Sequence, residues 1–146
     1  MNATIEKFGY PATLVHEYRH WVLLIRPAQV TAGSLILAAK GESTAYGALP
    51  AEAFSEQGSI VAELEQKLRD VVKMDKINYL MLMMVDPHVH FHIFPRYQGT
   101  RSFAGLALAD HGWPGPPDLK SALELDSTAI GRAVEAIRQD PLRNNA

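Results

Sequence analysis

Apolar residues gather in short runs along the chain, and turn-forming residues separate these runs. The first two runs are HWVLLIR, residues 20–26, and SLILAAK, residues 34–40. Both are rich in valine, isoleucine and leucine, a composition that favours buried strands. Proline and glycine in the intervening PAQVTAG indicate a turn or short loop. The pattern therefore predicts two neighbouring β-strands.

An amphipathic pattern follows the second strand, from about Pro50 to Lys73. Proline is tolerated in the first turn of a helix, and Glu52 favours the positive end of the helix dipole. Apolar residues recur at helical spacing, and charged residues take most of the other positions. The pattern predicts a helix laid on a sheet, whose buried face is formed by Phe54, Val61, Leu64, Leu68, Val71 and Val72.

Two further strands are predicted after this helix. KINYLMLMMV, residues 76–85, is apolar at nearly every position, which is typical of a central strand covered on both faces. Asp86 and Pro87 end it, because proline has no backbone donor and restricts the residue before it. The segment that follows is predicted to form the next strand, up to Pro95.

The remaining third of the chain is less regular. GTRSFAGLALADHGWPGPPDL, residues 99–119, is predicted to be irregular, since it is rich in glycine and proline. A last helix is predicted from about Ser127 to Gln139, with Asp126 as its N-cap. Its buried side is expected to carry Ile130, Val134 and Ile137.

These elements together predict an α+β fold, in which one main helix packs across a face of an antiparallel sheet and a C-terminal helix follows. The length of 146 residues suits a single domain spanning residues 1–146. Its core is expected at about residues 20–97, and a C-terminal extension at about residues 98–146.

Composition removes several classes of function. A formal net charge of −2 gives no broad basic field, so a nucleic-acid polymer is not an expected partner. The absence of cysteine excludes disulfides, thiolate metal sites and cysteine nucleophiles. The N-terminus lacks the apolar core of a signal peptide, and no apolar run approaches membrane-spanning length. A cytoplasmic protein without a membrane partner is therefore expected.

Candidate chemistry lies in VDPHVHFHIFPRY, residues 85–97, where His88, His90 and His92 occupy alternate positions. Residues two apart on a strand share a face, so the three imidazoles are predicted to lie on one side. The other side carries only apolar residues and belongs in the core. Unpaired ring nitrogens are costly to bury, so the histidine face is expected to border a cleft.

Three interpretations of the histidines compete. They are polar residues on a solvent-facing side of a sheet, or ligands of a metal ion, or a catalytic group that acts on phosphorus. Consecutive same-face residues stand about 6.6 to 7 Å apart, so three of them converge awkwardly on one ion. Nucleophilic attack on phosphorus needs neither metal nor thiol, and a flanking imidazole can bind the phosphate oxygens. This chemistry is preferred, with no cofactor and no metal expected.

HVHFHIFPR resembles the signature of the histidine-triad superfamily, in which three histidines alternate with hydrophobic residues. RPAQVTAGSLILAAKGESTAYGALPAEAF and KINYLMLMMVDPHVHFH are similar to family segments that precede and carry the triad. The resemblance thus covers about residues 21–97. It implies a histidine-triad-like α+β fold and, usually, a homodimer that hydrolyses or transfers nucleotides at the α-phosphate.

The resemblance also implies roles for single residues. His90 is expected to be the nucleophile that forms a nucleotidyl-histidine intermediate, and His92 is expected to contact the α-phosphate oxygens. His88 is expected to orient His90, partly through backbone hydrogen bonding. Asn78 falls where the family has an asparagine at the edge of the site, and Arg96 is a further candidate for substrate binding.

The substrate implied by the resemblance is a dinucleoside polyphosphate, a nucleoside phosphoramidate or a similar nucleotide conjugate. A nucleotide-binding protein with little turnover is the main alternative, followed by a metal site built from the same imidazoles.

The alternatives are motivated by departures from the family pattern. Glu42 stands where many members have a further histidine, and its charge would repel a phosphate. It is therefore expected to point away, unless the leaving-group chemistry differs. Met83 and Met84 replace phosphate donors and are expected to fill core space. Asp86 is expected to hold an imidazole or to begin a turn, and Trp113 to stack on a base, cover a dimer interface or simply pack.

Overall fold

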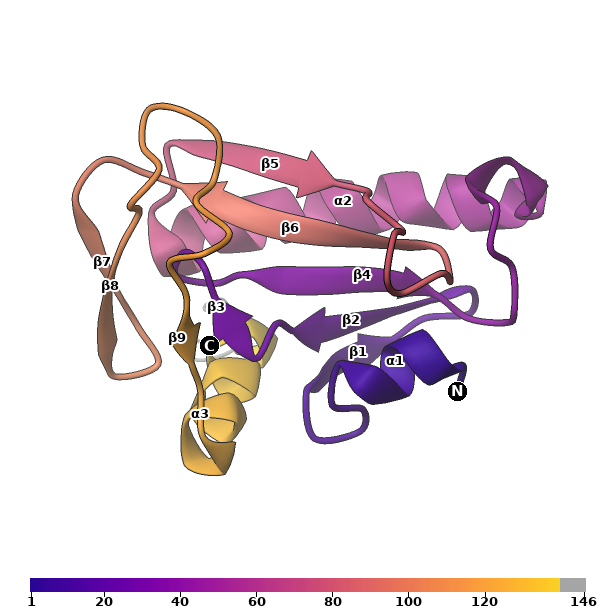
Figure 1. Ribbon diagram of the computed structural model, residues 1–146, viewed down its shortest axis with the longest axis horizontal. Helices are drawn as coiled ribbons and strands as arrows, with labels where there is room; N and C mark the ends of the chain where they lie inside the picture. Colours follow the sequence, from indigo (N-terminus) through magenta and orange to yellow (C-terminus); the bar gives the residue numbers. More distant parts are fainter. Residues whose placement is uncertain (140–146) are drawn as a thin grey trace, which may run out of the picture.

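The computed structural model describes residues 1–139, so the predicted domain end at residues 140–146 lies outside the described residues. Five antiparallel strands form the main sheet (Figure 1). In order across the sheet they are β1 (Leu14–Glu17), β2 (Trp21–Ile25), β4 (Leu35–Ala39), β6 (His90–Arg96) and β5 (Lys76–Leu80). Together with its helices this sheet confirms the predicted α+β fold.

Helices cover both faces of this sheet. Figure 1 shows the long helix α2 (Ala51–Val72) behind the sheet and the short helix α1 (Ala3–Lys7) on the opposite side. The C-terminal helix α3 (Ser127–Arg138) packs against β1 and β2, and a short 3₁₀ helix, η1 (Tyr46–Ala48), precedes α2. Two small antiparallel pairs complete the fold: β3 (Ala28–Gln29) with β9 (Leu123–Glu124), and β7 (Thr100–Phe103) with β8 (Leu106–Ala109).

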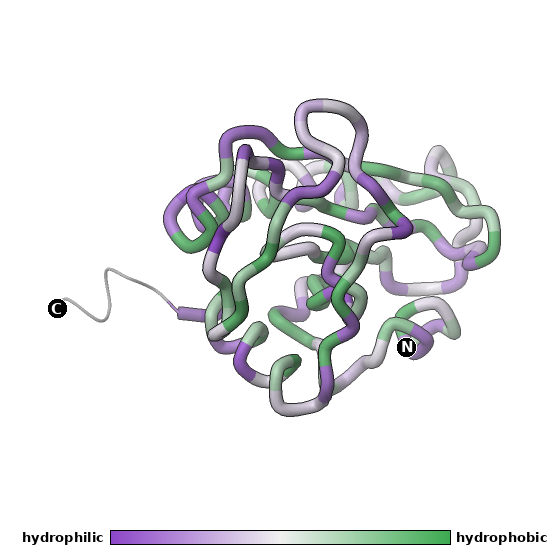
Figure 2. The backbone as a smooth tube through the Cα atoms, turned by 60° about the vertical axis from the view of Figure 1, so that its left-hand side comes forward, coloured by the Kyte–Doolittle hydropathy of each residue, from purple (hydrophilic) through white to green (hydrophobic). Residues whose placement is uncertain are grey.

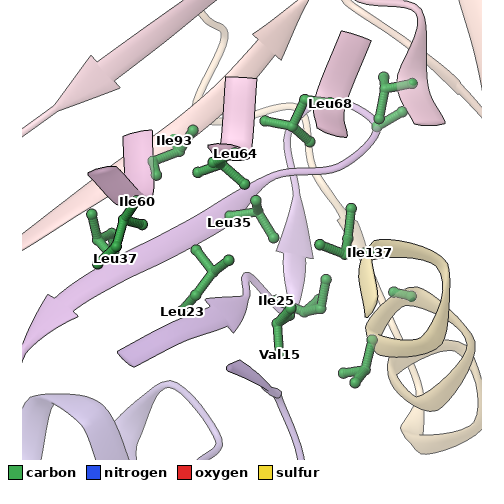
Figure 3. Packing of buried hydrophobic residues seen from close by; sticks show 14 of the residues in the cluster. Val15, Leu23, Ile25, Leu35, Leu37, Ile60, Leu64, Leu68, Ile93 and Ile137 are labelled. Carbon is green, nitrogen blue, oxygen red and sulfur yellow. The ribbon is translucent and has the colours of Figure 1, made fainter. Parts of the chain in front are cut away.

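The alternation of side chains in the strands divides the core into two clusters. Strand residues of one parity pack against α2 and α3 (Figure 3); they include Leu23, Ile25, Leu35, Leu37 and Ile93. Residues of the opposite parity pack against Ile5 of α1; they are Val22, Leu24, Ile36 and Ala38. Burying one valine, leucine or isoleucine side chain contributes about 1.5 to 3 kcal/mol to stability. In Figure 2 apolar stretches run through the middle of the molecule, while polar stretches lie at many outer turns.

The two predicted strands at residues 20–26 and 34–40 are confirmed as the neighbours β2 and β4. The loop between them is held by Gln29, whose side-chain oxygen accepts hydrogen bonds from the backbone of Gly33 and Ser34 at 3.0 and 3.1 Å. Gly33 has φ +79, a region that residues with a Cβ avoid. The loop therefore depends on a glycine at this position.

Replacing Gly33 with alanine should lower the free energy of unfolding by roughly 2 kcal/mol, because a non-glycine residue at positive φ is strained. The new Cβ would also lie 2.8 Å from Val72 Cγ2. Gly58→Ala is the matched control, since Gly58 lies inside α2 with nothing within 4 Å of an added Cβ. That change should stabilise the protein by about 1 kcal/mol. Urea unfolding of both variants measures the difference, and equal effects would contradict the prediction.

The predicted helix is confirmed between Pro50 and Lys73, which are its caps. Its buried face was predicted partly wrongly. The buried residues are Ala53, Ile60, Leu64, Leu68 and Val72, whereas Phe54 is 37% exposed. The last three buried positions are spaced by four, and the same spacing extends back to Ile60 rather than to Val61. The small Ala53, not the larger Phe54, meets the sheet.

The prediction of a central strand over residues 76–85 is wrong. Strand β5 ends at Leu80 and lies at the edge of the sheet, where it pairs with β6 alone. Met83 has φ +50, and the chain bends at residues 84–86. The apolar run therefore continues into an exposed loop instead of a buried strand.

Residues 99–119 also differ from the irregular segment that was predicted. Strands β7 and β8 form a hairpin around Ala104 and Gly105, with φ of +55 and +78. Two central residues at positive φ make the tight turn that hairpins favour. The helix α3 follows its prediction closely: Asp126 caps it by accepting from the backbone of Ala129, Val134 and Ile137 are buried, and Ile130 is half-buried.

No helix within residues 1–139 combines the length and the apolar character needed to cross a membrane.

Candidate functional site

Two of the three histidines lie on the face of the sheet that α1 covers. His90 pairs with Ala38 and His92 with Ile36, so both side chains share the face of the second core cluster. His88 lies in a bend two residues before β6 begins, so the prediction that it belongs to the strand is wrong, but its ring contacts Thr4 of α1 and therefore lies on the same side as the other two. Pro87 and the bend before it keep His88 out of the strand.

The His90 ring is fixed by a backbone contact. Its Nδ1 lies 2.7 Å from the carbonyl oxygen of His88. A carbonyl oxygen only accepts hydrogen bonds, so the proton of the neutral ring sits on Nδ1 and Nε2 keeps its lone pair. The residue is 2% exposed, and its ring packs against Phe8 and His92 at centroid distances of 5.6 and 5.0 Å. In its neutral form His90 therefore presents an unprotonated Nε2.

The His92 ring has the opposite arrangement. Its Nδ1 lies 3.3 Å from Nε of Arg26, and a guanidinium group only donates. Nδ1 is therefore the acceptor, and the proton of the neutral ring is on Nε2. Burial, the charge of Arg26 and the nearby His90 lower the pKa of His92 to about 4, although Asp86 acts in the other direction. At neutral pH His92 is an uncharged donor.

Two adjacent rings thus offer complementary groups. His90 Nε2 supplies a lone pair, and His92 Nε2 supplies an N–H. Such a pair can attack an electrophilic centre and hydrogen-bond an oxygen atom on it.

The third histidine is held by two side chains from distant segments. Nδ1 of His88 lies 2.8 Å from the hydroxyl oxygen of Thr4, and Nε2 lies 3.0 Å from Oε2 of Glu42. A carboxylate accepts, so His88 Nε2 carries a proton toward Glu42. The expectation that Glu42 points away is therefore corrected: its carboxylate hydrogen-bonds His88. Its side chain is 80% exposed, so the contact contributes little to stability.

The other acidic candidate has a different partner. Asp86 forms an ion pair with Lys7 at 2.6 Å and hydrogen-bonds no imidazole. It acts on the histidines only through space, as one cause of the pKa of His92. The expectation that Met83 and Met84 fill core space is confirmed for Met83, which packs against the core, and wrong for Met84, which is 86% exposed.

Arg96 and Asn78 lie on the histidine face, but farther along β6 and β5. The Arg96 guanidinium is buried against Asp110, with Nε to Oδ2 at 2.7 Å, and it donates to Asn78 Oδ1 at 2.6 Å. A further bond reaches the carbonyl oxygen of Gly115 at 2.8 Å. These contacts direct Arg96 toward the loop after β8, and its role in substrate binding stays a prediction.

Trp113 lies on this loop and is half-buried. A cavity of about 550 Å³ separates the loop from β5, lined by Lys76, Ile77, Asn78, Arg96, Trp113, Pro114, Gly115 and Pro116. The cavity borders the end of the histidine strand, and the indole is one of its walls.

Three contacts of the site were not predicted from the sequence: those of Thr4, Phe8 and Arg26. Thr4 and Phe8 come from α1 and its C-cap, and Arg26 follows β2. The only sequence signal for Arg26 is a charge at the end of an apolar run, just before a proline. Within residues 1–139, no group of three histidine, aspartate or glutamate side chains is arranged to hold a metal ion.

No family model matches the sequence, and no curated protein matches it. Solved structures do resemble the fold. A histidine triad protein from Bradyrhizobium japonicum matches with a TM-score of 0.72 at 17% identity, over 94% of both chains. One from Marinobacter aquaeolei VT8 matches with a TM-score of 0.72 at 20% identity, over 91% of this chain and 90% of the other.

A third similar structure is a hypothetical histidine triad nucleotide-binding protein from Sulfolobus tokodaii. Its TM-score is 0.68 at 18% identity, over 92% of this chain and 87% of that one. These likenesses show that the chain has the fold of histidine triad proteins.

Proposed function

We propose that this protein is a nucleotide hydrolase or transferase that attacks the α-phosphate of a nucleotide conjugate through Nε2 of His90. The observation that carries this proposal is the pair of adjacent rings, one with a free lone pair and one with an N–H. The fold agrees with it, since a protein of similar structure is described as nucleotide-binding.

The proposed reaction has two displacement steps. In the first, His90 Nε2 forms a bond to the α-phosphorus, and the bond from phosphorus to the leaving group breaks with its electron pair on that group. The imidazole becomes positively charged, and its Nδ1–H bond to the His88 carbonyl strengthens as a result. In the second step, water attacks phosphorus and the electron pair of the P–N bond returns to Nε2. One proton of the water ends on the leaving group and the other is released.

His92 binds the phosphate in this scheme. Its Nε2–H donates to a non-bridging oxygen of the α-phosphate, where negative charge accumulates during attack. Because His92 is uncharged, it adds no repulsion to the cation that forms on His90. The proposed substrates are a dinucleoside polyphosphate or a nucleoside phosphoramidate, both of which have an α-phosphate with a leaving group.

The test is incubation with a diadenosine polyphosphate, and separately with an adenosine phosphoramidate, in the presence of a chelator. Release of adenosine monophosphate supports the proposal, as does a nucleotide adduct on His90 in a mass spectrum of the quenched protein. Nucleotide binding with neither product nor adduct would instead favour a binding protein. Activity that disappears with chelator and returns with zinc would favour a metal site and contradict the mechanism.

We also propose that two copies of the chain associate through the β5 edge. The outer backbone groups of an edge strand are open to pairing with another chain. Beyond β5, Leu82, Met84 and Val85 are exposed by 51%, 86% and 81%, which is costly for apolar side chains facing water.

Replacing both Met84 and Val85 with aspartate should therefore yield a monomer, while the unmodified protein sediments as a dimer. The substitutions would remove the apolar burial and would bring negative charges from both copies to the interface, which disfavours association. Leu123→Asp is the matched control, since Leu123 is 44% exposed and lies on β9, which pairs with β3 outside the main sheet. Sedimentation velocity distinguishes the species, and a monomeric unmodified protein would refute the proposed dimer.

A further inference from the structure

Arg26 reaches the histidine face from the end of β2 and is held there by three contacts. Its Nε lies 3.3 Å from His92 Nδ1, and its Nη1 donates to the carbonyl oxygen of Ala28 at 2.6 Å. Its guanidinium carbon lies over the ring of Phe94, 5.5 Å from the centroid. Phe94 in turn is stacked almost parallel to His92, with ring centroids 6.2 Å apart. Arg26 and Phe94 thus hold both an edge and a face of the His92 ring.

We infer that Arg26 is a positioning residue that fixes His92 as an uncharged ring with its proton on Nε2, ready to donate to a phosphate oxygen. The identity of that ligand rests on the proposed function. The control of His92 by Arg26 rests on the geometry alone.

The direction of the hydrogen bond decides the tautomer. All nitrogens of a guanidinium group are donors, so Arg26 can bond Nδ1 only when that nitrogen is bare. Protonating Nδ1 would point its N–H at the N–H of Arg26. The imidazolium formed in this way would also lie beside the positive guanidinium. Burial lowers the pKa of Arg26 from its ordinary value while Glu124 opposes the shift. Arg26 stays charged near neutral pH, because an arginine loses its proton only in strong base.

The other charged or titratable groups around His92 do not reverse its preference for the uncharged form. His90 acts in the same direction as Arg26, and Asp86 acts in the opposite one. The carboxylate of Asp86 is engaged by Lys7 at 2.6 Å, which limits its pull on the imidazole. Burial is the largest cause of the low pKa of His92, and the charge of Arg26 is the second.

The consequence concerns both rings of the candidate site. Without Arg26, a fraction of His92 would carry its proton on Nδ1 and turn a lone pair toward the phosphate oxygen. At mildly acidic pH another fraction would be charged, 5.0 Å from the ring that becomes cationic when phosphorus is attached. Arg26 thus keeps the donor in place and keeps the nucleophile free of a neighbouring cation.

Two substitutions separate the hydrogen bond from the charge. In Arg26→Gln the amide nitrogen is as many bonds from the backbone as Nε of arginine, so a donor remains without a charge. In Arg26→Met both the donor and the charge are lost, and a flexible side chain of similar width remains. Arg101→Met is the matched control, since Arg101 also lies over an aromatic ring, that of Tyr97, and does not contact His92.

Imidazole NMR over a pH series is the readout, with His92→Gln used to assign the His92 signals. In the unmodified protein His92 should stay uncharged well below pH 6, with its proton on Nε2. Arg26→Gln should keep this tautomer but raise the pKa of His92, and Arg26→Met should raise the pKa and give both tautomers. The kcat should fall at least about tenfold in Arg26→Met and less in Arg26→Gln, with little change in KM.

The inference is overturned if His92 in Arg26→Met titrates at the same pH and keeps the same tautomer as in the unmodified protein. The same holds if Arg101→Met changes the titration of His92 as strongly as Arg26→Met does. If no preparation turns over a nucleotide, the proposed function fails, but the His92 titration still decides the role of Arg26.

Discussion

Replacing His90 with alanine should lower kcat for nucleotide release by at least about a thousandfold, because the group that forms the bond to phosphorus is lost. Nδ1 of His90 is bonded to the His88 carbonyl, so Nε2 is the nitrogen available for attack. The same substitution should abolish the nucleotide adduct in the mass spectrum. Substrate binding should change less than kcat, since His92 and the rest of the site remain.

The controls separate chemistry from folding. His90 is buried, so His90→Ala and the polar His90→Asn are both compared by circular dichroism before the assay. His16→Ala is the matched histidine control. His16 is exposed on β1 and contacts Tyr18 at a centroid distance of 4.4 Å, away from the triad. Full turnover by a folded His90 variant would exclude the covalent mechanism.

Replacing Asp110 with alanine should lower the free energy of unfolding by about 3 to 5 kcal/mol, because the buried charge of Arg96 then loses the only acidic partner it has within residues 1–139. The pair is almost fully covered, with side-chain exposures of 4% and 1%. The carboxylate also accepts from the backbone of Tyr97 and Gly112 at 3.1 and 3.2 Å. Urea unfolding measures the loss.

Two comparisons identify the buried charge as the cause. Asp75→Ala removes the partner of Arg101 in an exposed pair at 3.3 Å, and it should cost no more than about 1 kcal/mol. The double variant Arg96→Met with Asp110→Leu should be more stable than Asp110→Ala alone, because no charge is left buried. If Asp110→Ala lost as little stability as Asp75→Ala, the buried charge of Arg96 would not be the cause.

The Arg96–Asp110 pair also shapes the surroundings of the candidate site. It joins the end of β6 to the loop that carries Trp113, so the wall of the adjacent cavity depends on it. An arginine after the histidine signature is a reasonable candidate for phosphate binding when only the sequence is considered. The fold gives it an aspartate partner 14 residues away, and the spacing of the two residues in the sequence does not predict that contact.

Several elements were predictable because the forces that set them act between near neighbours. The strands at residues 20–26 and 34–40, the extent of α2 and the N-cap Asp126 all follow from local propensity and capping. The apolar back of the histidine strand was equally readable, since Val89 and Ile93 are both fully buried. The hairpin at residues 100–109 was missed because alanine is an unusual residue at the positive φ that its turn requires.

In the histidine run, the sequence determines which side chains share a face but not which ring nitrogen carries the proton. The alternation of residues determined that His90 and His92 share a face, because side chains on a strand alternate with a period of two. The states of the rings were decided by partners that only folding supplies: a backbone carbonyl for His90, and Arg26, 66 residues away, for His92. A tautomer depends on which atom lies opposite each ring nitrogen, so it is a property of the tertiary structure.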